Sequence, residues 1–199
     1  MVLVENSLIM RFAKTEVLEW FDRQDRTYRL ALLCTNWIRD IRGYKPSSSE
    51  EARGFSMKVR GRWLSFADLA DMLEQQSSRD ALSSDFILNQ LHALIRAPFE
   101  ILHNYCEDYD KTDPTRPLLE KMKAASWYEV ARIIRNTISH NFHVQYKKTE
   151  PITWNGITLS REMDGKAITY ESLWHKSGYE LFLEMRTFAE ALPEVIQEI

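Results

Sequence analysis

Residues 126–140 read Ser-Trp-Tyr-Glu-Val-Ala-Arg-Ile-Ile-Arg-Asn-Thr-Ile-Ser-His, and their pattern predicts the helix that decides the fold. Ser126 and Glu129 have the spacing of a capping box, in which each side chain satisfies a free amide of the first turn. The apolar positions recur three or four residues apart and so share one face of the helix; they are Trp127, Val130, Ala131, Ile134 and Ile138. Such a face must be buried against other elements, so the stretch predicts a helical bundle.

The chain before this helix has the same helical periodicity. Residues 15–42 predict a long helix that ends before Gly43 and Pro46. Its expected apolar stripe comprises Val17, Leu18, Trp20, Phe21, Leu30, Leu33 and Ile38. Caps then predict two more helices, at 66–76 after Ser65 and from Ser84 or Asp85 to about 108. Residues 113–117 predict a turn, and a short helix is expected to follow it.

The chain after residue 150 changes character. Residues 152–154 and 157–159 predict two strands joined by a tight turn at Asn155-Gly156, and Asp164-Gly165 predicts a second turn before residues 167–170. Residues 171–190 return to helical periodicity, and 193–198 are expected to add a turn of helix. The predicted fold is therefore an all-α bundle of about five main helices, one domain over 1–199, with a small β insertion at 151–170.

Length and composition exclude several classes of protein. The 199 residues have a net charge of −3, so no global basic field draws the chain to nucleic acid. Cys34 and Cys106 form no disulfide or metal pattern and are expected in the core. We find no signal peptide and no apolar run of membrane length, so we expect a cytoplasmic protein without a membrane partner.

The polar face of the 126–140 helix carries the candidate chemistry. At about 100° per residue, Arg132, Arg135, Asn136, Ser139 and His140 lie away from the apolar stripe. These groups suit RNA cleavage by the 2′-hydroxyl, with His140 as acid–base group, Arg135 as phosphate ligand and Asn136 as orienting partner. One His serves poorly as both acid and base, so we expect two copies of the chain to form a composite site.

Arg135, Asn136 and His140 resemble the motif of the HEPN superfamily (higher eukaryote and prokaryote nucleotide-binding domains). The resemblance covers the predicted helices from about 15 to 142 and the closing helix at 171–190, and the β insertion departs from it. It implies a HEPN-like helical bundle, a homodimer with the motif at its interface and metal-independent cleavage of RNA. It also implies a role as a toxin or phage-defence effector, with an antitoxin or regulatory protein as a further partner. The alternative is a non-catalytic HEPN-like module that binds nucleotide or a protein partner.

A bare pattern of Arg and His separated by four to six residues has little weight alone, because Arg96 and His103 also match it, with six residues between them. Asn136 directly follows Arg135, whereas Ala97 follows Arg96, and this difference favours the 135–140 stretch. Second-rank candidates for substrate binding are Arg132, Ser139, His143, Lys147 and Lys148.

For three other features of the sequence, we favour a structural role over a functional one. His140 and His143 lack further ligands at metal spacing, so we expect no metal and no cofactor. Residues 53–63 hold four cations and no acid, together with Phe55 and Trp63; we interpret them as a solvated connector, with RNA contact as the alternative. His92 and His103 are interpreted as satisfied histidines of the bundle.

Overall fold

The computed structural model describes residues 11–39, 54, 56–65, 67–139, 142–168, 173 and 175–194. Its contacts divide the chain into two compact units. The first unit comprises residues 1–26 and 91–199, and the second comprises residues 27–90. The division falls inside two long helices, α1 (Lys14–Arg39) and α4 (Gln76–Thr112). The prediction of an all-α class with a small β insertion is confirmed.

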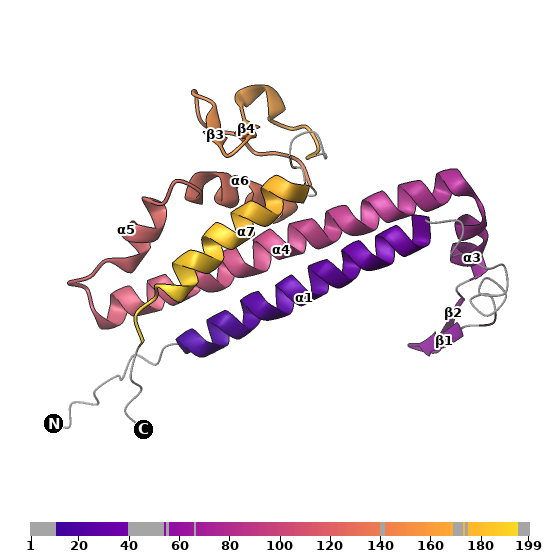
Figure 1. Ribbon diagram of the computed structural model, residues 1–199, viewed down its shortest axis with the longest axis horizontal. Helices are drawn as coiled ribbons and strands as arrows, with labels where there is room; N and C mark the ends of the chain where they lie inside the picture. Colours follow the sequence, from indigo (N-terminus) through magenta and orange to yellow (C-terminus); the bar gives the residue numbers. More distant parts are fainter. Residues whose placement is uncertain are drawn as a thin grey trace. The chain divides into compact units, whose positions relative to one another are not determined.

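The core of the first unit forms where α7 (His175–Glu190) packs along α1 and α4, as Figure 1 shows. Phe21 and Phe182 are fully buried, with their ring centroids 5.4 Å apart. Gly178 permits the close approach of α7 to α4, because a Cβ built there would lie 2.6 Å from Cδ1 of Leu91, which is itself fully buried. The closing helix therefore needs its glycine to lie this close to α4.

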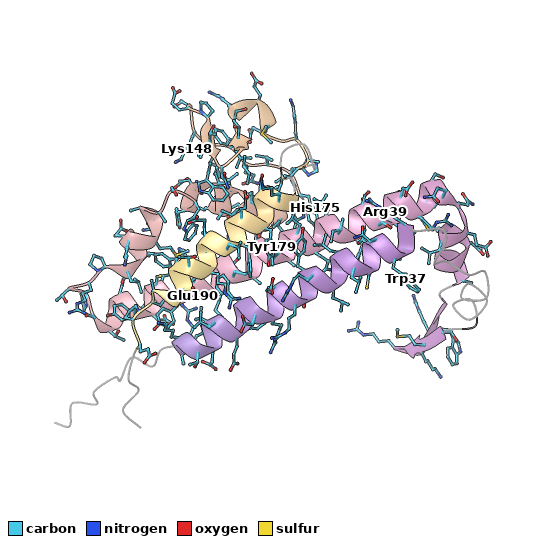
Figure 2. The ribbon with its side chains drawn as sticks, viewed as in Figure 1. Trp37, Arg39, Lys148, His175, Tyr179 and Glu190 are labelled. Atoms are coloured by element: carbon cyan, nitrogen blue, oxygen red, sulfur yellow. The ribbon has the colours of Figure 1, made fainter. Side chains whose placement is uncertain are left out.

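Polar contacts fix the same three helices to one another. Tyr179, labelled on α7 in Figure 2, donates its hydroxyl to Asp25 of α1 at 2.6 Å, and Arg186 pairs with Asp22 at 2.8 Å. Arg11 binds Asp108 of α4 through its amide and its side chain, at 2.7 Å for the closest atoms. The hydrogen bonds from Arg11 outweigh the effect of burial and lower the pKa of Asp108 to about 2.

The short helix α5 (Leu118–Lys123) is capped from a neighbouring helix. Its N-cap residue is Pro117, whose side chain makes no capping bond. Asp110 of α4 accepts hydrogen bonds from the Leu118 amide at 2.6 Å and the Leu119 amide at 3.1 Å. A carboxylate is stabilising at this end of a helix, so α4 fixes where α5 begins.

The predicted helix at 126–140 is α6 (Tyr128–Ser139), but the predicted capping box is wrong. Ser126 is exposed in a turn, and Glu129 instead binds Arg132 and Lys148. The buried face includes Ile133 and the fully buried Thr137 rather than Ile138. The Thr137 hydroxyl donates to the Ile133 carbonyl at 2.8 Å, which satisfies it inside the core.

The predicted β insertion is confirmed at its first turn. β3 (Ile152–Trp154) and β4 (Ile157–Leu159) pair antiparallel, and Asn155 and Gly156 have φ of 41° and 80°. Positive φ at both central residues is the signature of a type I′ turn. Ile157 and Leu159 are buried, and β3 packs against α6. A short 3₁₀ turn, η1 (Arg161–Met163), follows.

The expected third strand is reduced to one antiparallel bridge between His143 and Ala167. The Asp164-Gly165 turn is present, and the Ile168 amide donates to the Phe142 carbonyl at 3.0 Å. Residues 169 and 170 lie outside the described part of the chain, as do 195–198 of the predicted last turn of helix.

The second unit contains a hairpin that the sequence did not indicate. β1 (Ser56–Val59) and β2 (Arg62–Ser65) pair antiparallel through a turn at Arg60 and Gly61, with φ of 49° and 80°. The helix α3 (Ala67–Glu74) follows, close to its predicted bounds. The expected cap at Ser84 or Asp85 is wrong, because α4 already begins at Gln76. Arg79 of α4 joins the two helices, because its Nη1 donates to the Leu73 and Glu74 carbonyls at the end of α3.

The predicted stripe on α1 is only partly correct, and Trp20 in its first part is 38% exposed. Val17 and Phe21 are buried, and burial continues at Tyr28, Ala31 and Thr35. Leu30 and Leu33 were expected on that face, yet they are 60% and 66% exposed. Among the helices of the described residues, none combines the length and apolarity needed to cross a membrane.

Candidate functional site

The site is built on the last turns of α6, which packs through aromatic residues. Tyr128 lies 5.5 Å from Phe99 of α4, and Trp127 lies 5.9 Å from Phe188 of α7, between ring centroids. Burial of one face leaves Arg132, Arg135 and Asn136 partly exposed on the other, as the sequence predicted. His140 and Asn141 lie outside the described residues, so the structure describes the Arg–Asn half of the motif.

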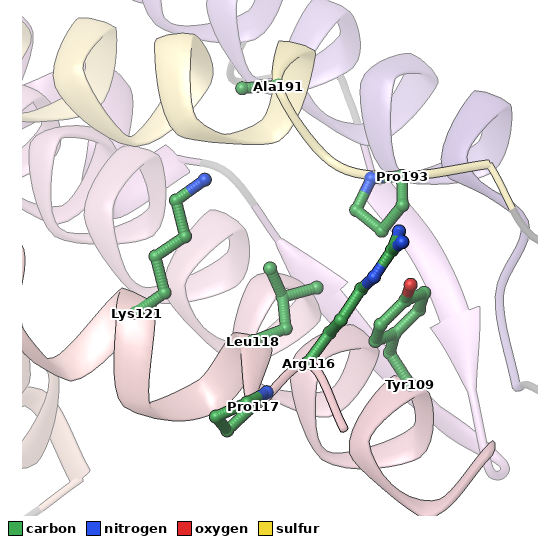
Figure 3. A pocket seen from close by; sticks show the side chains of 7 residues that line it. All are labelled: Tyr109, Arg116, Pro117, Leu118, Lys121, Ala191 and Pro193. Atoms are coloured by element: carbon green, nitrogen blue, oxygen red, sulfur yellow. The ribbon is translucent and has the colours of Figure 1, made fainter. Parts of the chain in front are cut away.

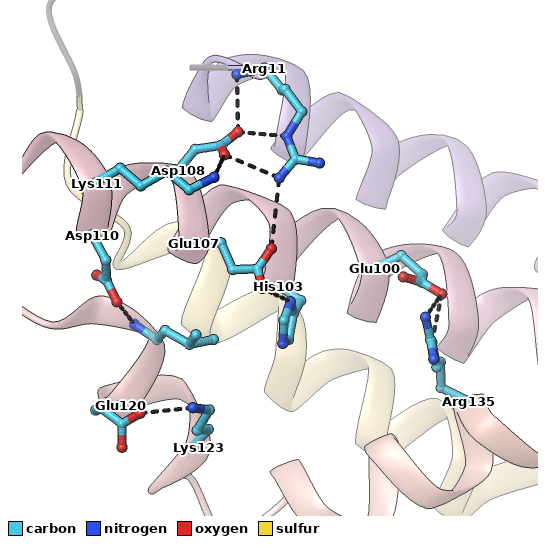
Figure 4. A network of polar contacts seen from close by, with 11 residues as sticks. Arg11, Glu100, His103, Glu107, Asp108, Asp110, Lys111, Glu120, Lys123 and Arg135 are labelled. Carbon is cyan, nitrogen blue, oxygen red and sulfur yellow. Dashed lines mark hydrogen bonds and ion pairs between the residues drawn. The ribbon is translucent and has the colours of Figure 1, made fainter. Parts of the chain in front are cut away.

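Arg135 is held by two neighbours. Its Nε donates to Oε1 of Glu100 on α4 at 2.6 Å, and its Nη2 lies 2.5 Å from the same oxygen, as Figure 4 shows. Its Nη1 donates to Oδ1 of Asn136 at 2.9 Å. Sequence reasoning missed Glu100, which lies 35 residues before Arg135 and belongs to no local motif.

The guanidinium of Arg135 keeps donors for a further acceptor. Arg has five N–H groups, and the contacts with Glu100 and Asn136 use one each on Nε, Nη2 and Nη1. One N–H on Nη1 and one on Nη2 remain. Because the side chain is 33% exposed, these two donors can reach a phosphate oxygen while Glu100 fixes the plane of the group.

A small pocket with a volume of about 140 Å³ opens beside Asn136. We call it the cationic pocket; its lining residues are Arg132, Ile133, Asn136, Gln145, Lys147 and Lys148. Four of these were predicted from the sequence as site residues, whereas Ile133 and Gln145 were not. Three cations and two amides around one cavity favour an anionic group.

Glu129 organises two of the three cations. It accepts from Arg132 at 2.9 Å and pairs with Lys148 at 3.0 Å. Burial raises the pKa of Glu129, but the hydrogen bonds from Arg132 and Lys148 outweigh burial, and the pKa is held below its usual value. Glu129 is therefore ionised at neutral pH and neutralises one of the positive charges. Two positive charges remain around the pocket.

The other predicted residues are less well placed. Ser139 is exposed, and its hydroxyl donates to the Arg135 carbonyl at 3.2 Å, within its own helix. His143 is exposed, does not line the cationic pocket, and joins the bridge to Ala167. Neither contributes to the cavity that contains Asn136.

The hydrogen bonding and protonation of His92 could not be predicted from the sequence. It is 2% exposed, and neither ring nitrogen has a hydrogen-bond partner among the described residues, so the expectation of a satisfied histidine is wrong. Its ring stacks on Phe142, which follows the motif, at 5.1 Å between centroids. Burial lowers its pKa to about 4, so the imidazole is neutral. His103, by contrast, pairs with Glu107 at 3.6 Å.

Two larger cavities lie elsewhere in the first unit. One of about 370 Å³, shown in Figure 3, lies between the end of α4, α5 and the chain after α7. The other, about 390 Å³, is mainly apolar and is lined by Phe12, Trp20, Ala93, Arg96, Ala97, Glu100, Ile101 and Asn104. No described residue of the predicted site lines either cavity, although Glu100 lines the second and binds Arg135.

The cysteines and metal-binding groups give no second site. Cys106 is buried as expected, and burial raises its pKa to about 12, whereas Cys34 is half-buried. Within the described ranges, no three His, Cys, Asp or Glu side chains come together as potential metal ligands.

Comparisons with protein-family models, with curated proteins and with solved structures find no match to this chain.

Proposed function

We propose that this protein is a metal-independent endoribonuclease of the HEPN type that acts as a homodimer. The observation that carries the proposal is the cationic pocket beside Asn136, next to a partly exposed Arg135. Its volume of about 140 Å³ is below the roughly 300 Å³ at which sites for whole small molecules begin. It therefore suits one charged group of a longer ligand, such as a phosphate of an RNA chain.

In the proposed reaction, the 2′-oxygen of a ribose attacks the adjacent phosphorus. A base takes the 2′-hydroxyl proton, the bond from phosphorus to the 5′-oxygen breaks, and an acid gives a proton to that oxygen. The products are a 2′,3′-cyclic phosphate and a 5′-hydroxyl. The two His140 side chains of a dimer would supply base and acid, and Arg135 would stabilise the charge on the phosphorane.

The decisive experiment is cleavage of bulk RNA by the purified protein in EDTA. We expect cyclic phosphate ends from the wild type and a loss of about 100-fold or more for His140→Ala and Arg135→Ala. Arg96→Ala and His103→Ala are matched controls, because they have the same residue types at a similar spacing and lie outside the cationic pocket. Equal cleavage by the wild type and His140→Ala would overturn the assignment.

The dimer is tested by mixing. Refolding the wild type together with an excess of His140→Ala chains converts most wild-type chains into mixed dimers. If both His140 side chains serve one composite site, activity per wild-type chain falls as the variant is added. Activity that stays proportional to the wild-type chains contradicts the composite site, while the cleavage experiment above remains valid.

A non-catalytic module that binds phosphate-bearing ligands is the second candidate. The cationic pocket favours it, because the described residues around that cavity already bring three cations and two amides together. In this case the wild type binds an oligoribonucleotide without cleaving it, Lys147→Ala weakens binding, and His140→Ala leaves binding unchanged. Cleavage that requires His140 excludes this alternative.

A further inference from the structure

The β1–β2 hairpin of the second unit is a positively charged element far from α6 in the sequence. Residues 53–65 contain four cations and no acid, in a chain whose net charge is −3. Lys58, Arg60 and Arg62 are all exposed, and none forms an ion pair with a residue that the structure describes. The hairpin therefore keeps a local positive charge that no ion pair with the described residues neutralises.

The strand register places an aromatic ring beside this charge. Lys58 is directly opposite Trp63 across the two strands, and directly opposite residues point to the same face. Trp63 is 70% exposed, more than any other large hydrophobic residue described. Arg60 lies in the turn, two residues after Lys58, and adds a second exposed cation at the tip of the hairpin.

We propose that the hairpin binds single-stranded nucleic acid through the face that carries Lys58 and Trp63, together with Arg60 at the tip. An exposed indole ring gives a base a surface on which to stack, and neighbouring cations contact the phosphates on either side of that base. Stacking is tolerant of sequence, so the hairpin contributes affinity without selecting a particular base. This binding element is separate from the cationic pocket and does not depend on the proposed cleavage.

Nucleic acid is favoured over a lipid surface by the position of the charges. A hairpin that inserts into a bilayer needs an apolar tip, whereas the tip here is Arg60-Gly61. Trp63 lies behind the turn and opposite Lys58. Insertion of the indole ring would therefore draw charged side chains into the bilayer, which is costly.

The test measures binding of the full-length chain to a labelled oligomer of twelve thymidylates by fluorescence anisotropy. This probe lacks the 2′-hydroxyl, so the proposed nuclease cannot cleave it, and binding is measured apart from cleavage. We expect Trp63→Ala to weaken binding by roughly 5- to 100-fold, from the loss of one stacked base. Lys58→Ala should weaken it less and reduce the dependence of log affinity on log salt by about 0.7.

Met57→Ala is the matched control, because Met57 is 42% exposed on the opposite face of the same hairpin. It should bind like the wild type, and far-ultraviolet circular dichroism should show that all variants are folded. Equal affinity of wild type, Trp63→Ala and Lys58→Ala overturns the proposal. So does Trp63-dependent sedimentation with vesicles of phosphatidylcholine and phosphatidylserine without binding of the oligomer.

The outcome is separable from that of the proposed nuclease. Arg135→Ala and His140→Ala should bind the oligomer through the hairpin while failing to cleave RNA. Loss of binding in Trp63→Ala with wild-type cleavage of a dinucleotide substrate would place the hairpin outside the reacting site. Binding that depends on Lys147 but not on Trp63 overturns the hairpin proposal and leaves the cationic pocket intact.

Discussion

The two hairpins in the described part of the chain have similar turns and differ in how far their side chains are buried. Both are antiparallel pairs joined by a two-residue turn, with φ of 49° and 80° at Arg60-Gly61 and of 41° and 80° at Asn155-Gly156. The β3–β4 hairpin buries alternate residues against the helices, whereas the β1–β2 hairpin exposes an indole ring and three cations.

The difference shows that the backbone geometry of a two-residue turn does not determine the role of the hairpin that it joins. In β3–β4 the turn is tied to α7, where Asn155 donates to Glu180 at 2.7 Å. Its buried side chains make it part of the core of the first unit. In β1–β2, by contrast, Met57, Lys58, Arg62 and Trp63 are all exposed, and a two-stranded hairpin alone is only marginally stable in water. The predictions below test this contrast, beginning with the largest expected effect.

Truncation of Leu159 to Ala should give the largest loss of stability. Leu159 is fully buried, so the variant loses apolar burial and leaves a cavity, at a cost of about 2–5 kcal/mol. Met57→Ala in the other hairpin should cost less than about 0.5 kcal/mol. Urea unfolding at pH 7 measures both free energies. Comparable losses at the two sites would show that the hairpins do not differ in the way described.

Mild acid should act on the side of the molecule that carries β3–β4. The His92 ring stacks on the Phe142 ring, and the Phe142 carbonyl accepts a hydrogen bond from the Ile168 amide. Proton uptake by His92 should therefore disturb the segment around Phe142 and Ile168. The pKa of His92 is about 4 in the folded chain against about 6.5 unfolded, so the unfolded state binds more protons between these values. Stability is complete above about pH 6.5 and falls as the pH drops toward 4.

At pH 5 this loss should amount to about 2 kcal/mol, since each unit of pKa difference corresponds to about 1.4 kcal/mol. Urea unfolding at pH 7 and pH 5 measures it. His92→Phe keeps the ring and removes the titration, so its stability should change much less over this interval. Asp108 does not interfere, because its pKa of about 2 makes its contribution fade only below about pH 4. A wild-type loss that persists in His92→Phe would assign it to another group.

Glycine substitutions in the two turns should give the smallest effects and the sharpest contrast. Gly61 and Gly156 both have φ of 80°, where a side chain is strained, so each Ala variant should destabilise its turn by about 1 kcal/mol. Gly156→Ala should lower the global free energy of unfolding, because its hairpin belongs to the core. Gly61→Ala should leave global stability unchanged and weaken binding of the thymidylate oligomer. A global effect of Gly61→Ala would show that β1–β2 is also part of a core.

The two turns also show how far the sequence predicts this structure. Asn155-Gly156 was recognised because Asn tolerates positive φ and the flanking residues alternate. Arg60-Gly61 has the same backbone but was interpreted as a connector, because Arg is not typical of the first position and because cations usually indicate solvated loops. Local turn preferences therefore do not always predict where strands pair, and the turn at Arg60-Gly61 becomes evident only from the pairing of β1 with β2.

The candidate site was predictable where it depends on one helix and not where it depends on contacts between elements. The spacing of Arg132, Arg135 and Asn136 placed them on one face of α6, as the structure confirms. No periodicity links Glu100 to Arg135, or Glu129 to Lys148, because packing of separate segments brings these residues together. The false capping box has the same origin: Glu129 binds two cations instead of the helix amide that its spacing predicted.

Gly178 has a consequence for how this sequence can diverge. The space that a side chain at position 178 would need is filled by Leu91, 87 positions earlier in the chain. Position 178 can therefore grow only where position 91 shrinks, and the two should change together among descendants of this protein. A homologue with Ala at position 178 should have a smaller residue at position 91. Correlated change at these two positions can therefore help to identify remote homologues that share only the order of the helices.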